Sequence, residues 1–163
     1  MSFWLWSFIG GLFGTAVMDL AGWPLRRLGV NDGLGGLLGR WVLGFRRFSF
    51  VIDGNLELDT AETIPEKIIG SLFHYAIGGG SVALVFPTFF VTTGIELPGN
   101  YIVAGLIFGV ASVGLTWFLQ YPCFGFRFFG QNAPRGASTI WPPALLHSLY
   151  GLGIGLVLQL AMS

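Results

Sequence analysis

Four long apolar stretches constrain the fold of this chain more than any other feature. A membrane-crossing helix needs about 20 mostly apolar residues, at about 1.5 Å rise each, to cross about 30 Å of hydrocarbon. Four segments meet this requirement, at about 3–22, 63–93, 101–121 and 141–162. Charged residues make up only 10% of the chain, far fewer than a water-soluble domain carries. The sequence therefore predicts an all-α integral membrane protein, with residues 1–163 forming a single four-helix transmembrane domain.

The basic residues indicate how these spans are oriented. All eight Lys and Arg side chains fall in two regions, which hold Arg26, Arg27, Arg40, Arg46, Arg47 and Lys67 in the first and Arg127 and Arg135 in the second. Cytoplasmic loops of membrane proteins carry an excess of Lys and Arg. We therefore predict that the loops 23–62 and 122–140 face the cytoplasm and that both termini lie on the opposite side.

Small residues predict how the spans pack. Pairs of glycines stand four residues apart on three spans, namely Gly10 and Gly14, Gly105 and Gly109, and Gly151 and Gly155. Such spacing lets helix backbones approach closely in lipid, although glycine is also simply common in membrane helices. Three pairs together favour a tight bundle, and Gly78 on the second span is a further candidate packing residue.

Spans two and four resemble each other in sequence. The segment "LFHYAIGGG" from Leu72 aligns without a gap with "LLHSLYGLG" from Leu145, matching His74 with His147 and Gly78 with Gly151. Composition alone can produce part of this match. If the match is a true repeat, the chain consists of two tandem helical hairpins related by a pseudo-two-fold axis along the membrane normal.

The first basic loop contains further signals. Apolar residues recur at helical spacing over about 34–48, which predicts a cytoplasmic helix that lies in the membrane interface, with packing against the spans as the alternative. The segment "VIDGNLEL" contains an Asp-Gly turn and predicts a small hairpin. "TIPE", from Thr63 to Glu66, predicts a capping box at the start of the second span.

Several short motifs occur in a definite order: "GTAVMDLAGW", "GRW", "HYAIG", "LQYP" and "HSLYG". In order and spacing the chain resembles a family of small bacterial inner-membrane proteins filed as domain of unknown function 2938. The resemblance covers about residues 14–160. It implies four spans in a bacterial inner membrane, with periplasmic termini if the charge rule holds, and it implies no activity. The chain departs from the family pattern before the second span and after the third.

Few residues could carry chemistry inside the membrane. The candidate polar cluster consists of Asp19, His74, His147 and Gln120. Ionisable groups at this depth are costly and usually face the protein interior. Because the two histidines align, we predict that both point inward at matching depth, with Asp19 hydrogen-bonded to at least one of them.

Several roles remain open for this cluster. Neutral histidines can set helix register through hydrogen bonds. His74 and His147 could instead supply axial ligands to haem or another tetrapyrrole, or bind a metal. A small-solute or proton-coupled transporter acting as a dimer is a third hypothesis. No cofactor is assigned by the sequence.

No catalytic motif is present, which favours a protein that is not an enzyme. A net charge of zero gives no basic surface for nucleic acid. The interpretation we prefer is a non-catalytic accessory or structural subunit that packs through its Gly-rich helix faces in a larger respiratory or photosynthetic membrane assembly. Its expected partners are the lipid bilayer and other membrane subunits or further copies of itself.

Overall fold

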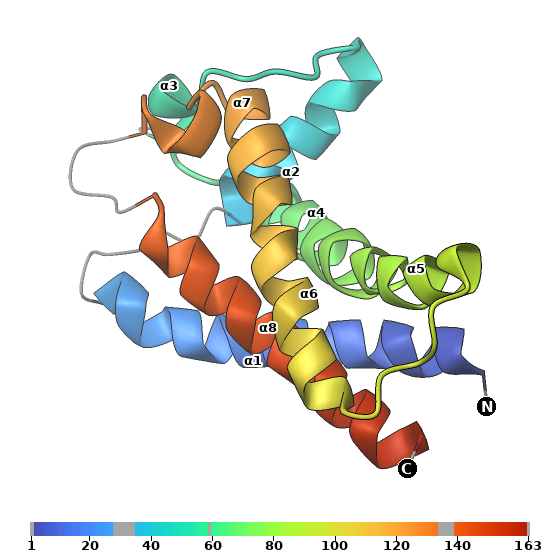
Figure 1. The fold of residues 1–163 in the computed structure, drawn as a ribbon. Coiled ribbons are helices and arrows are strands. Elements are labelled where there is room, and N and C mark those ends of the chain that lie inside the picture. Colours follow the sequence, from blue (N-terminus) through green and yellow to red (C-terminus); the bar gives the residue numbers. More distant parts are fainter. Residues whose placement is uncertain (1, 28–34, 59, 134–138, 163) are drawn as a thin grey trace. The chain divides into compact units, whose positions relative to one another are not determined.

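The computed structural model describes residues 2–27, 35–58, 60–133 and 139–162, and these residues form helices and loops without a strand (Figure 1). The elements in chain order are α1 (Phe3–Arg27), α2 (Gly35–Gly44), η1 (Phe45–Arg47), α3 (Gly54–Leu58), α4 (Ile64–Phe73), η2 (His74–Ser81), α5 (Val85–Thr93), α6 (Tyr101–Leu115), η3 (Thr116–Gln120), α7 (Tyr121–Cys123), η4 (Phe128–Gly130) and α8 (Trp141–Met162). The elements η1 and η4 are 3-10 turns, whereas η2 and η3 are π-helical.

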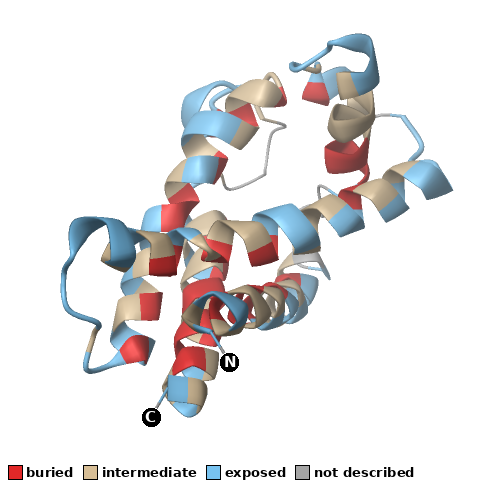
Figure 2. Ribbon diagram, turned by 90° about the vertical axis from the view of Figure 1, so that its right-hand side faces the viewer, coloured by how far each residue is buried: buried red, intermediate tan, exposed pale blue. Residues whose placement is uncertain are grey.

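Four helical segments are long and apolar enough to cross a membrane, at Phe3–Leu25, Ile64–Thr93, Tyr101–Cys123 and Trp141–Met162. This confirms the predicted fold class and the four spans. Large apolar side chains on these helices, such as Leu20, Ile107 and Leu160, are exposed. Exposed turns alternate with buried ones along the helices (Figure 2). The exposed apolar faces are the surfaces that contact lipid.

Two helix ends lie further along the chain than the sequence predicted, and both involve proline. The first helix was expected to end near Gly22 but continues through Pro24 to Arg27. Proline removes only one backbone donor, and the Arg27 guanidinium stacks 3.7 Å from the Trp23 ring centre, four residues back on the same helix face. The third span likewise continues through Pro122, which occupies the first turn of the short helix α7.

The second span begins as predicted and then changes its helical form. The Thr63 side chain accepts a hydrogen bond from the Glu66 backbone, and the Glu66 side chain accepts one from the Thr63 backbone, which confirms the capping box. From His74 to Ser81 the helix is π-helical. A turn at Leu84 then separates it from α5, which contains Pro87 in its first residues.

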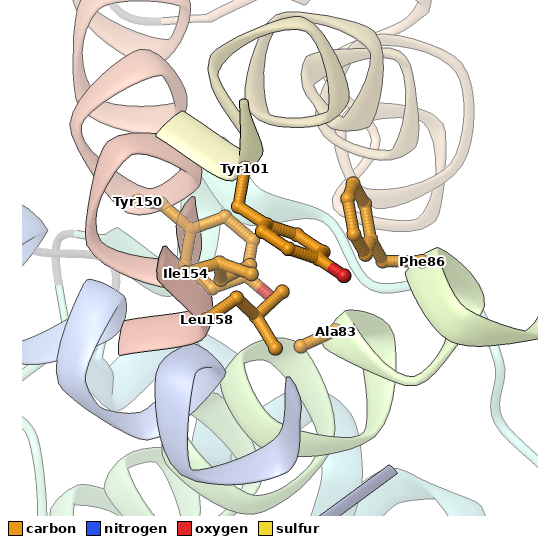
Figure 3. Close-up of a cluster of buried hydrophobic side chains, with 6 residues drawn as sticks. All are labelled: Ala83, Phe86, Tyr101, Tyr150, Ile154 and Leu158. Atoms are coloured by element: carbon orange, nitrogen blue, oxygen red, sulfur yellow. The ribbon is translucent and has the colours of Figure 1, made fainter. Parts of the chain in front are cut away.

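The described helices divide into two compact units. The first unit contains residues 1–21, 75–112 and 145–163, and the second contains residues 22–74 and 113–144. In the first unit, six residues form a buried apolar core (Figure 3), namely Ala83, Phe86, Tyr101, Tyr150, Ile154 and Leu158. They come from η2–α5, α6 and α8, so parts of three spans share this core.

The second unit has its own core, formed by Leu37, Leu38, Tyr121, Phe124 and Phe126. The helix predicted over 34–48 is present as α2 followed by η1; Leu34 itself lies outside the described residues. Its apolar residues pack on α4 and α7, which is the second of the two alternatives that the sequence left open. Its depth in a membrane stays a prediction.

The hairpin predicted at "VIDGNLEL" is wrong, because this segment forms the short helix α3. The Asp53 carboxylate accepts hydrogen bonds from the backbone of Asn55 at 3.2 Å and Leu56 at 3.4 Å. Asp53 therefore acts as a helix cap rather than as part of a hairpin turn, a role that aspartate favours as much as it favours turns.

Candidate functional site

Glycines in the first unit bring helix backbones into direct contact. A Cβ atom added at Gly105 would lie 2.7 Å from the Gly155 nitrogen, and one added at Gly151 would lie 2.6 Å from the Gly109 Cα. These contacts join α6 to α8. On the other side of α8, a Cβ at Gly153 would lie 2.5 Å from the Gly14 Cα on α1. These glycines therefore pack the chain's own helices together.

Gly78 is the exception among the predicted packing glycines. It is exposed, whereas the next residue, Gly79, is buried against Gly11 and Thr15 of α1. The reason is the π-helical form of η2, because a π-helical turn holds about one more residue than an α-helical turn. In the hairpin of spans one and two, Gly79 thereby occupies the packing position that Gly151 occupies in the hairpin of spans three and four.

His147 is engaged in a hydrogen bond between helices of the first unit. Its Nδ1 lies 2.9 Å from the Ser112 hydroxyl oxygen on α6, and this hydroxyl lies 2.7 Å from the Gly109 carbonyl. A serine hydroxyl has one hydrogen to donate. When Ser112 donates it to Gly109, the Nδ1–H of His147 donates to Ser112, and Nε2 is the unprotonated nitrogen.

Two more polar contacts join helices in this unit. Asp19 on α1 and Tyr75 on η2 share a side-chain hydrogen bond. The Tyr150 hydroxyl on α8 donates a hydrogen bond of 2.6 Å to the Gly79 carbonyl on η2. Polar groups inside a membrane protein are satisfied across helices in this way, which fixes helix register at a modest gain in stability.

The predicted cluster is distributed over both units. Asp19 and His147 belong to the first unit, while His74 and Gln120 belong to the second, where both are half-buried. Tyr75, the residue that bonds to Asp19, directly follows His74. The matched depth of the two histidines and a hydrogen bond from Asp19 to either of them stay predictions.

The most extensive polar arrangement of the second unit was not predicted as a site. Arg40 on α2 donates to the Glu66 carboxylate at 2.9 Å, to the Glu57 carboxylate at 3.2 Å, and to the carbonyls of Glu57, Thr60 and Ala61. The Arg40 side chain is only 9% exposed. Its hydrogen bond with Glu66 raises the pKa of Arg40 above the usual arginine value.

Close backbone packing surrounds this arginine. A Cβ added at Gly39 would lie 2.8 Å from the Glu66 Cα, and one added at Gly70 would lie 2.9 Å from the Gly39 nitrogen. The signal for this arrangement was present in "GRW" at Gly39–Trp41, one of the motifs on which the family resemblance rests. Its partners lie 17 to 26 residues away in the chain, so spacing alone could not reveal them.

No group of three or more His, Cys, Asp or Glu residues that could hold a metal occurs in the described part of the chain. Comparison with known sequences gives one family, described as Protein of unknown function (DUF2938), whose profile matches residues 8–160. No curated protein and no solved structure matches the chain.

Proposed function

The chain belongs to the DUF2938 family, and from this premise we propose that it is a non-catalytic membrane subunit that works by associating with another membrane protein. The observation that supports this best is how the first unit uses its polar groups. His147, Tyr150 and Asp19 are engaged in hydrogen bonds between the chain's own helices. Groups held in this way set helix register rather than meet a substrate.

The surface available to a partner is the exposed apolar surface of the spans. The predicted glycine pairs are buried inside the first unit and are not accessible to a partner, while large side chains such as Ile107, Val103 and Leu160 make up much of the exposed apolar surface. Gly78, which is exposed, offers a place on η2 where another helix could approach closely.

A photo-crosslinking experiment in intact membranes tests this proposal. We expect a crosslinker placed at Gly78 to capture one recurring protein of defined mass, whereas a crosslinker at Val103 or Leu160 captures that protein more weakly or not at all. If the membranes are extracted with a polymer that keeps the surrounding lipid, we also expect the chain to elute in a particle larger than one that holds a monomer. A particle holding one copy and lipid, with no crosslink at any exposed position, would refute the proposal.

One observation favours a second candidate, a metal- or tetrapyrrole-binding protein. The Nδ1 of His147 lies 2.9 Å from the Ser112 hydroxyl oxygen, and metal-binding histidines commonly form such a hydrogen bond through the ring nitrogen that does not bind the metal. We expect His147→Gln to keep the helix contact and His147→Leu to lose it. Visible absorption or bound metal in the purified protein that both variants abolish would support ligation instead.

We also propose that both basic loops face the cytoplasm of a bacterial cell and that both termini are periplasmic. The distribution of the eight basic residues supports this orientation. Cysteines introduced at Ser2 and Ser163 in a C123S background should react with a membrane-impermeant maleimide in cells whose outer membrane is permeable. Labelling that requires disruption of the inner membrane would reverse the orientation.

A further inference from the structure

Two short segments of the second unit each expose arginine beside phenylalanine side chains. We call them the arginine–aromatic surface, and its members are Arg46, Arg47, Phe48 and Phe50 after α2, and Arg127, Phe128 and Phe129 after α7. Phe48 is 85% exposed, the largest value among the exposed apolar residues of the described chain. Exposed phenylalanines gathered beside cations mark a binding surface rather than an ordinary water-facing loop.

The first segment is held in place by its neighbours. The Phe48 backbone donates to the Phe45 carbonyl at 3.1 Å, and the Trp41 indole donates to the Phe50 carbonyl at 2.8 Å. The Phe45 ring contacts both Trp41 and Phe50, with ring centres 4.7 Å and 5.5 Å away. The exposure of Phe48 is therefore fixed by the fold around it.

The backbone of this surface is unusual. Phe48, Arg127 and Phe129 have φ angles of 56°, 59° and 56°, and no other non-glycine residue in the described part of the chain has a positive φ. Bulky residues adopt this conformation at a cost, and such strain gathers at functional positions. All three strained positions belong to the arginine–aromatic surface.

The second segment continues the lipid-facing surface of the third span. The Phe129 ring lies 5.4 Å from Trp117 and 5.0 Å from Phe118. Phe118 is 55% exposed on the span itself. The third span ends at Cys123, and Arg127 lies about one helical turn further along the chain. Lipid phosphates are expected at this distance from the end of an apolar helix.

The arginines of this surface have no anionic partner among the described residues. Arg40 and Lys67 form ion pairs with glutamates, whereas no described carboxylate lies within ion-pair distance of Arg46, Arg47 or Arg127. A guanidinium presents a planar set of donors that matches the oxygens of a phosphate. The positive charges of the arginines and the apolar rings of the phenylalanines thus complement the phosphate and the acyl chains of a phospholipid.

We propose that the arginine–aromatic surface binds anionic phospholipids, with the guanidinium groups on the headgroup phosphates and the phenylalanine rings among the acyl chains. The inference does not rest on the proposed function, because it concerns lipid and not a protein partner. It assigns the lipid contact to Phe48 and its neighbours, not to the stripe of α2, whose Leu37 and Leu38 are buried in the core of the second unit.

Native mass spectrometry of the purified full-length protein tests the headgroup contact. With phosphatidylglycerol and phosphatidylcholine supplied together, we expect wild type to retain phosphatidylglycerol preferentially. Each arginine near an anionic lipid surface strengthens binding roughly fivefold. The change R46Q/R47Q should therefore lower the preference for phosphatidylglycerol by about 25-fold. The matched control R27Q/K67Q removes the same charge elsewhere in the second unit and should keep the preference. The variant R46K/R47K keeps the charge but loses the planar donors, so it should keep part of the preference.

A depth measurement tests the aromatic contact. A spin label on F48C, in a C123S background and in phosphatidylglycerol nanodiscs, should be reached by oxygen more than by a water-soluble nickel complex. A label on T60C, an exposed loop position of the same unit, should show the reverse. Equal nickel accessibility at both positions, equal loss of lipid in R27Q/K67Q, or displacement of the lipid by glycerol phosphate alone would overturn the proposal.

Discussion

Replacing Arg40 with methionine should lower the free energy of unfolding by about 3 kcal/mol, because removing one partner of a nearly buried ion pair strands the other. Glu66 would lose its guanidinium contact at 2.9 Å, and the carbonyls of Thr60 and Ala61 would lose their donors. In a chain of this size the melting temperature should fall by roughly 6–12 °C. A thermal melt of the purified protein in detergent measures this shift.

The matched control is Lys67→Met. Lys67 pairs with Glu62 at 3.6 Å, and both side chains are well exposed, at 60% and 38%. An exposed pair of this kind contributes about 0–1 kcal/mol, so the control should melt close to wild type. Arg40→Lys should fall in between, since an ammonium keeps the charge and loses the forked geometry. If R40M melts at the same temperature as K67M, the hydrogen bonds and ion pairs around Arg40 do not hold the second unit together.

The four spans could be predicted because length and apolar composition are properties of a local stretch of sequence. The capping box at Thr63 is local too, and its two hydrogen bonds are present. The predicted ends at Pro24 and Pro122 fell short for a physical reason. A proline disfavours helix in the residue before it, but that preference is small beside the cost of unpaired backbone groups in a membrane.

The exposed position of Gly78 shows what a gapless alignment assumes. Aligning His74 with His147 carries Gly78 onto Gly151 only if both helices hold the same number of residues per turn. The π-helical turns of η2 break this condition, and Gly79 is buried in place of Gly78. A sequence carries no simple signal for a π-helix, so the packing residue could be predicted only to within one position.

The candidate site could be predicted in part. The cost of polar groups in lipid picks out Asp19 and His147 as residues that need partners, but it does not identify those partners. The partners that the structure gives, Tyr75 and Ser112, depend on helix packing. The partners of Arg40 could not be predicted, because they come close to it only when α2 packs on α4.

The second large effect is expected at Gly151, where α8 meets α6. A methyl group added there would lie 2.6 Å from the Gly109 Cα and 2.7 Å from the Gly109 nitrogen, so the backbones must separate. Overpacking of this kind costs about 1–3 kcal/mol, and we expect Gly151→Ala to melt several degrees below wild type. Gly151→Leu, which cannot be placed without moving α6, should lose the folded monomer on size-exclusion chromatography.

Gly114→Ala is the matched control, because the nearest atom to its added Cβ would be the Phe118 ring carbon at 3.8 Å. Alanine is the better helix former by about 1 kcal/mol, so this variant should melt at or above wild type. The double variant G105A/G151A should cost less than the sum of its singles, since both methyl groups enter one contact and the first opens space for the second. Strict additivity, or a rise in melting temperature for Gly151→Ala, would mean that α6 and α8 are not held together by their glycine backbones.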